Sequence, residues 1–214
     1  MSHVTAYGTI KLDNPKDIRK AIGNQAAAAL TSRVRKNTPK VLSNIKDKLR
    51  EALIDCHEFA LLKSKHYGEF GMPDIDARMG AVVNALVDTV RIDFNGFSFK
   101  SNKLAGKVKL LGCPASNREV LQMSEAYLVS DGGTFPWFEA LIDSNSVAIP
   151  GFWYADGIVD TSYSRTGEGV MLKRTGATWK VPLDLYGSPD ANFITGAIAS
   201  IYDFVAVQMR SLLS

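Results

Sequence analysis

Apolar residues recur at helical spacing through the first third of the chain. Asn14 can cap a helix, Pro15 suits its first position, and Asp17 lies near the positive end of its dipole. An apolar stripe then advances in steps of four residues: Ile18, Ile22, Ala26, Leu30 and Val34. The pattern predicts an amphipathic helix whose apolar stripe drifts slowly around its axis.

A second helical segment follows Thr38 and Pro39. Its apolar face comprises Leu42, Ile45, Leu49, Leu53, Cys56 and Ala60, and its other face carries Lys40, Lys46, Lys48 and Arg50. Pro39 leaves two alternatives open, because a proline either kinks one long helix or separates two.

The middle of the chain combines a helix with a β region. Asp74 is the predicted cap of a third helix, whose apolar side comprises Ile75, Met79, Val82, Val83, Leu86 and Val90. Residues 92–99 alternate around Asn95-Gly96, a pair typical of a hairpin turn. Val108 and Leu110 extend this β region.

The second half of the chain repeats this alternation of helix and strand. Ser116 and Glu119 form a predicted capping box for a helix through Tyr127, and Pro136 begins a short aromatic-rich helix that ends near residue 142. Residues 146–182 are β-like and rich in glycine. Ser188-Pro189 opens the last predicted helix, with the stripe Ile194, Ala197, Ile198, Ile201, Val205, Met209 and Leu212.

These elements predict an α+β fold with long N-terminal helices, a small, mostly antiparallel sheet and a closing C-terminal helix. The chain has 214 residues, of which 46% are apolar and 22% charged, values typical of a folded globular protein. No linker divides it. We expect a single elaborated domain over residues 1–214, with a basic helical part at 16–66 and an α+β body at 67–214.

Charge is distributed unevenly along the chain. The net charge is +3, yet residues 16–65 carry +7 and residues 66–214 carry −4. The small total argues against a protein whose whole surface wraps nucleic acid. The uneven distribution makes the basic N-terminal third the feature to explain.

No residue pattern indicates catalysis. Cys56 and His57 are neighbours on a predicted helix and would point about 100° apart. His3 and His66 lack partners at metal-ligand spacing, Asp74 and Asp76 suit a helix start, and Asp156 and Asp160 suit a solvated loop. We therefore expect no enzyme activity, no cofactor and no metal.

The chain also lacks an 18-residue apolar run and a signal sequence, so no membrane span and no secretion are expected. Both cysteines are expected to stay reduced.

Two groups of residues are candidates for binding. Arg33, Arg35, Lys36 and Lys40 form a basic cluster that could serve as a contact surface, or could be an ordinary solvated face. The large aromatic residues Trp137, Phe138, Trp153 and Tyr154 suit either core packing or anchoring at a subunit interface. Arg165 lies in a Gly/Ser-rich segment, residues 155–169, that could act as an interaction arm.

Three segments resemble a known family, the neck and tail-completion proteins of tailed bacteriophages related to the HK97 gp10-like proteins. They are Phe135-Pro-Trp-Phe-Glu-Ala-Leu-Ile142 ahead of Val147-Ala-Ile-Pro150, Arg165-Thr-Gly-Glu-Gly-Val-Met171 leading into Trp179-Lys-Val-Pro182, and Asn192-Phe-Ile-Thr-Gly-Ala-Ile198. Together they span roughly residues 120–205.

The resemblance implies a virion protein, made in the host cytoplasm, that forms a homo-oligomeric ring at the head–tail junction. Its implied partners are portal or head-completion proteins on one side and tail tube or terminator proteins on the other. The basic cluster would then contact a neighbouring subunit or line a lumen through which DNA passes. We favour the subunit contact, since Asp47, Glu51, Asp55 and Glu58 would sit poorly against phosphate. The alternative is a nucleic-acid-binding protein that uses the basic face around residues 33–50.

Overall fold

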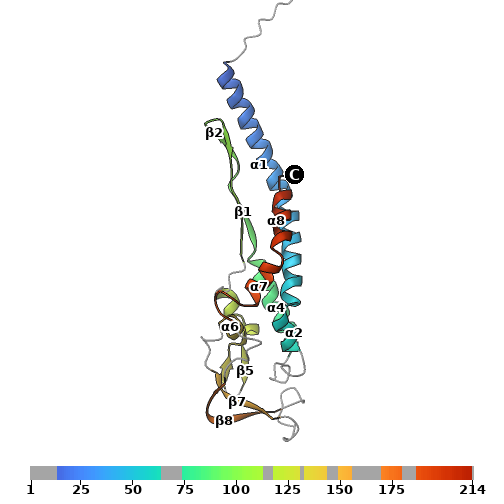
Figure 1. The fold of residues 1–214 in the computed structure, drawn as a ribbon, viewed down its shortest axis with the longest axis vertical. Helices are drawn as coiled ribbons and strands as arrows, with labels where there is room; N and C mark the ends of the chain where they lie inside the picture. The colour runs from blue at the N-terminus through green and yellow to red at the C-terminus, as the bar shows by residue number, and fades with distance from the viewer. Residues whose placement is uncertain are drawn as a thin grey trace, which may run out of the picture.

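The protein is elongated, with one long helix running along most of its length (Figure 1). In the computed structural model, the residues described are 14–63, 74–112, 118–130, 133–143, 149–155, 170–179 and 187–213. The fold is α+β, as the sequence predicts, with a long N-terminal helix, antiparallel strand pairs and C-terminal helices.

Helices form most of the described structure. They are α1 (Pro15–Ile54), α2 (His57–Lys63), α4 (Ile75–Asp88), α5 (Arg118–Leu121), the 3₁₀ turn η1 (Ser124–Ala126), α6 (Trp137–Ile142), α7 (Phe193–Ser200) and α8 (Tyr202–Ser211). The strands are β1 (Arg91–Phe94), β2 (Ser98–Lys100), β3 (Lys103–Ala105), β4 (Val108–Leu111), β5 (Leu128–Ser130), β6 (Gly133–Phe135), β7 (Ile149–Ala155) and β8 (Val170–Trp179). They pair as β1–β4, β2–β3, β5–β6 and β7–β8, all antiparallel.

Helix α1 resolves the two alternatives left by Pro39, because it is a single helix of 40 residues that contains the proline. Its start follows the prediction: the Asn14 side chain accepts a hydrogen bond from the Lys16 amide at 3.1 Å. Pro39 has no N–H to donate, so the turn before it lacks one backbone bond. In that turn the Thr38 hydroxyl donates to the Val34 carbonyl at 2.8 Å.

Helix α4 begins where predicted, but Asp74 does not cap it. Asp74 has a left-handed backbone, φ 55°, and its side chain makes no capping hydrogen bond. The left-handed conformation is not the β-region backbone from which a capping side chain reaches the first turn. Most of the predicted apolar side is buried, and Ile75 is partly buried.

The Asn95-Gly96 pair is not the hairpin turn that the sequence predicts. Strand β1 pairs with β4 and β2 pairs with β3, so residues 91–111 form one long ribbon with an interruption in the middle. Gly96, φ 98°, lies in that interruption, where the Phe97 amide donates to the Thr31 hydroxyl at 2.9 Å. The turn itself is made by Ser101 and Asn102, both with positive φ, as a type I′ turn requires.

The outer part of the ribbon, with β2 and β3, lies against the N-terminal half of α1 (Figure 1). The Phe99 ring occupies the space that a side chain at Gly23 would fill, so the buried glycine allows a close approach of strand and helix. Phe97 contacts the helix near Thr31 and Phe99 contacts it near Gly23, so the ribbon points toward the start of α1. This segment of the ribbon, residues 98–109, is called the hairpin below.

The C-terminal helices differ from the prediction in two ways. Asn192 caps α7, not Ser188, and it forms a capping box with Thr195. The helical stripe is also interrupted at Ile201, which separates α7 from α8. Helix α8 lies beside α1 and ends at its middle: Asn44 donates to Gln208 at 3.0 Å, and Asn37 to the Leu212 carbonyl at 3.4 Å.

Other predicted segments are confirmed in part. The helix expected through Tyr127 is shorter, since α5 ends at Leu121 and η1 follows, and Ser116 lies outside the described residues. The β-like region at 146–182 contains the antiparallel pair β7–β8. Val147, Val181 and residues 156–169 lie outside the described residues.

One hydrophobic cluster joins the two ends of the chain. Its members come from the C-terminal part of α1, from α2 and α4, and from α6 and α7, and Leu212 completes it. Upstream of Val34, the buried side of α1 contributes only small residues, Gly23 and Ala27. The core therefore ends near the middle of α1, and the rest of the helix projects beyond it.

Candidate functional site

The projecting part of the molecule is strongly basic. Residues 14–40 of α1 and the hairpin together carry eleven Lys or Arg residues and a single acidic one, Asp17, for a net charge of +10. All eleven cationic side chains are exposed: Lys16, Arg19, Lys20, Arg33, Arg35, Lys36, Lys40, Lys100, Lys103, Lys107 and Lys109. We call this unit, residues 14–40 with 98–109, the basic arm.

The four basic residues singled out from the sequence all lie in this arm, but they do not share one face. Arg33, Lys36 and Lys40 follow one another at three- and four-residue spacing and lie on one side of α1. Arg35 is two positions from Arg33 and therefore points to a different side. The predicted cluster is thus a three-residue face with Arg35 apart from it.

Sequence reasoning missed the hairpin lysines, because they were counted in the acidic remainder of the chain. Lys100 and Lys103 are paired residues on adjacent strands, so their side chains lie on the same face of the hairpin. Phe99 precedes Lys100 on β2 and points to α1. Because successive side chains on a strand alternate between faces, Lys100 and its partner Lys103 lie on the outer face. The available signal was the absence of any acidic residue from 94 to 118.

Ion pairing separates the arm from the rest of the protein. No cation of the arm forms an ion pair with any residue in the described ranges. Between described residues, the ion pairs are Lys46–Asp88, Lys48–Glu51, Arg50–Asp47 and Lys63–Asp76, and all of them lie beyond the arm. Positive charge is therefore balanced locally around the core and left unbalanced on the arm.

The arm also exposes apolar residues. Ile18 is 39% exposed and Ile22 is 62% exposed, although both belong to the predicted stripe. A four-residue step advances about 40° beyond a full turn, so the stripe rotates by about 160° between Ile18 and Val34. Because Val34 faces the core, Ile18 faces nearly the opposite way. We call Ile18 and Ile22 the apolar ridge.

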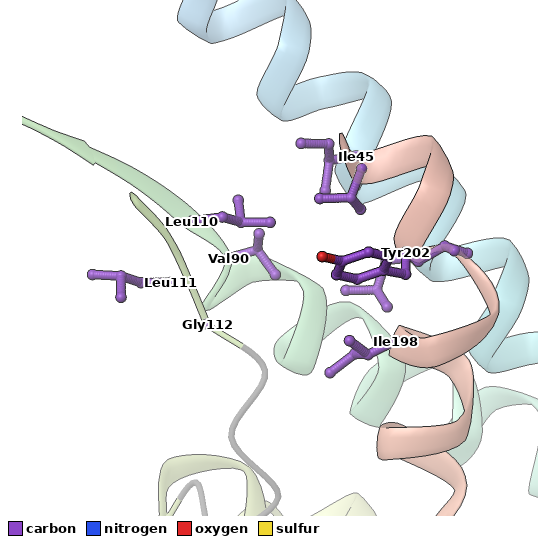
Figure 2. Close-up of a pocket in the computed structure, with 10 residues that line it drawn as sticks. Ile45, Val90, Leu110, Leu111, Gly112, Ile198 and Tyr202 are labelled. Atoms are coloured by element: carbon purple, nitrogen blue, oxygen red, sulfur yellow. The ribbon is translucent and has the colours of Figure 1, made fainter. Parts of the chain in front are cut away.

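A second apolar surface lies at the other end of α1. A groove with a volume of about 190 Å³ is lined by Ile45, Leu49, Leu110, Leu111, Ile198 and Tyr202, among others. Figure 2 shows the Tyr202 ring extending from α8 into the space between that helix and β4. Tyr202 is 71% exposed, and Leu111 and Ile198 are also exposed, so the groove opens to solvent.

Two of the four aromatic candidates are buried in the core, and the side chains of the other two lie outside the described residues. Trp137 and Phe138 are each 1% exposed, so neither is available as an interface anchor, and the packing alternative holds for both. They are buried because α6 packs with α7: the Phe138 and Phe193 rings meet edge to face at 5.9 Å. The side chains of Trp153 and Tyr154 and the whole of Arg165 lie outside the described residues.

Among the described residues, the candidates for catalysis do not gather in one cluster. Asp76 pairs with Lys63 at 2.7 Å, and no group of three His, Cys, Asp or Glu residues gathers as a metal site within the described part of the chain. His3, His66, Asp156 and Asp160 lie outside it. Cys56 packs against the core, and burial raises the pKa of its thiol to about 12.

The raised pKa predicts slow alkylation of Cys56. Only the thiolate is nucleophilic, and at pH 8 a thiol of pKa about 12 is ionised in about 1 molecule in 10⁴. We expect the alkylation rate in the folded protein to rise about tenfold per pH unit from pH 7 to 9. Denaturant should accelerate it to the rate of an ordinary cysteine. Iodoacetamide labelling followed by peptide mass spectrometry measures Cys56 separately from Cys113, and rapid labelling of the folded protein would contradict the prediction.

No family model, curated protein or solved structure matches this chain. In the described ranges, none of the helices combines the length and the apolar character needed to cross a bilayer. The arguments about function below therefore start from the basic arm, the apolar ridge and the groove.

Proposed function

We propose that this protein is a non-catalytic structural subunit that assembles into a closed homo-oligomeric ring, and that the ring serves at the head–tail junction of a tailed-phage virion. The observation that carries the proposal is the projecting half of α1, which exposes the apolar ridge beyond the core. The resemblance of residues 120–205 to phage neck and tail-completion proteins supports the location.

The apolar ridge and the groove have the properties of the two halves of one contact. The ridge presents branched aliphatic side chains four residues apart on a helix, and the groove is open and lined by aliphatic residues and Tyr202. Burying an isoleucine side chain contributes about 1.5–3 kcal/mol, so filling the groove with two of them would favour association.

One copy cannot fill its own groove. Ile22 and Ile45 lie on the same helix, 23 residues apart, which separates them by about 35 Å at 1.5 Å per residue. The ridge of one copy must therefore enter the groove of another. A contact between two unlike surfaces repeats from copy to copy, and it produces a ring when the rotation closes.

The position of the ridge also suits this contact sterically. Helix α8 ends beside Asn37, and the hairpin covers the side of α1 that carries Gly23 and Ala27. The side that carries Ile18 and Ile22 is left accessible over about one helical turn, which is the shape needed to enter a groove on a neighbour.

Native mass spectrometry and negative-stain electron microscopy of the purified protein test the ring. We expect one closed oligomer that persists on dilution into the micromolar range, with a central opening in the images. A protein that stays monomeric at high micromolar concentration would refute ring formation. In a phage that lacks the gene, the proposed location predicts filled heads and complete tails that fail to join.

A further inference from the structure

We propose that the basic arm binds the phosphate backbone of duplex DNA. This inference goes beyond ring assembly and does not depend on it, because it uses the charged surface of the arm and not the apolar ridge. Its basis is the net charge of +10 on a unit whose cations all face solvent and form no ion pair with a described residue.

The hairpin keeps an arrangement that is unfavourable without an anion. Lys100 and Lys103 are directly opposite each other on adjacent strands, and like charges so placed destabilise a hairpin. Lys107 and Lys109 add two further positive charges. Asp93 lies opposite Lys109 on β1, but residues 98–109 themselves contain no acidic residue to offset Lys100, Lys103 or Lys107. Phosphate groups would remove this repulsion, and contacts of this kind need no base sequence.

The surface of the arm favours a duplex over a single strand. Proteins that bind single strands stack the bases on exposed aromatic rings. Residues 14–40 contain no aromatic residue, and the only one in the hairpin, Phe99, lies against Gly23. The arm therefore offers cations without a stacking surface.

The length of the arm also matches a duplex. From Lys16 to Lys40 the helix rises by about 36 Å, which is close to one turn of B-DNA. Over that length a duplex presents about 20 phosphates, so several cations of the arm can be neutralised at once.

An acidic surface on a neighbouring subunit is a weaker partner for the arm. Asp47, Glu51, Asp76 and Asp88 already form ion pairs with basic residues near the core. Asp47 and Glu51 were among the acidic residues that argued against a phosphate partner, but they lie about 10 Å or more beyond Lys40 along α1, outside the arm. The structure thus removes the reason to prefer a subunit contact over DNA.

Fluorescence anisotropy with a labelled 30-base-pair duplex tests the inference in the full-length protein between 50 and 200 mM salt. Each phosphate contact contributes about 0.9 to the slope of log affinity against log salt concentration. We expect K100Q/K103Q to reduce that slope by about 2 for each protomer in contact. Across this salt range the unsubstituted protein should lose at least about twelvefold more affinity than the variant.

The matched control is R118Q/R210Q, which removes two exposed positive charges outside the arm and should leave the slope unchanged. The inference is overturned by absence of duplex binding at 50 mM salt, by preference for a single strand of equal length, or by equal slopes for the two variants. Native mass spectrometry of the same samples reports ring formation separately, so a ring that does not bind DNA would overturn only this inference.

Discussion

The double substitution I18E/I22E is expected to abolish the proposed ring and to leave a folded monomer. In the protomer, both side chains are exposed and neither belongs to the hydrophobic core, so glutamate at both positions should leave the free energy of unfolding within about 0.5 kcal/mol. In the proposed contact, each carboxylate would enter an aliphatic groove, where an unpaired charge is strongly unfavourable. Native mass spectrometry should show monomer only, with an unchanged thermal transition.

The control for this variant is I54E/V207E, which places two glutamates at other exposed apolar positions of α1 and α8. Neither residue lines the groove, so this variant should still form rings. Loss of the ring in both variants would mean that added negative charge, and not the apolar ridge, prevents assembly.

Mixing two defective variants tests whether the contact joins unlike surfaces. Y202E places a charge in the groove and leaves the ridge intact, and I18E/I22E does the reverse. Each variant alone should be monomeric. A mixture should give heterodimers, because one intact ridge can still enter one intact groove, and it should give no ring. Two-fold contacts of ridge with ridge would give no heterodimer.

The sequence predicted what depends on neighbouring residues and less of what depends on distant ones. The cap at Asn14 and the buried side of α4 are local, and both elements begin where expected. The stripe through Ile18 and Ile22 was predicted as a pattern, but which of its residues are buried depends on where the core ends. That position is set by α8, more than 150 residues away, which reaches only to Asn37.

The hairpin shows a similar limit. Asn95-Gly96 has a strong local preference for a turn, yet the Thr31 hydroxyl binds the Phe97 amide and Phe99 packs on Gly23. These contacts with α1 extend the ribbon past the glycine and move the turn to Ser101 and Asn102. The same extension brings the hairpin lysines beside α1, so the basic arm could not be assembled from charge counts along the chain.

The substitution W137A will destabilise the protomer by about 3–5 kcal/mol, the usual range for truncating a buried tryptophan. Trp137 is 1% exposed, its ring lies 5.8 Å from Phe138, and its indole N–H donates to the Glu125 carbonyl at 2.6 Å. The truncation removes the ring contacts and leaves that carbonyl without its donor. Calorimetry should show a fall in Tm of about 6–20 °C for a chain of this size.

W137F separates packing from hydrogen bonding at the same position. It keeps most of the ring volume and loses only the N–H, so the expected loss is about 1–3 kcal/mol. Both losses should appear equally in the I18E/I22E background, because the ring contact with Phe138 and the hydrogen bond to Glu125 both lie within one protomer. If W137A kept the stability of the unsubstituted protomer but failed to form rings, Trp137 would act as an interface anchor. Its burial within the protomer would then contribute nothing to folding stability. The edge-to-face contact of Phe138 with Phe193 argues for the opposite result, since that contact ties α6 to α7 and Trp137 lies directly beside it.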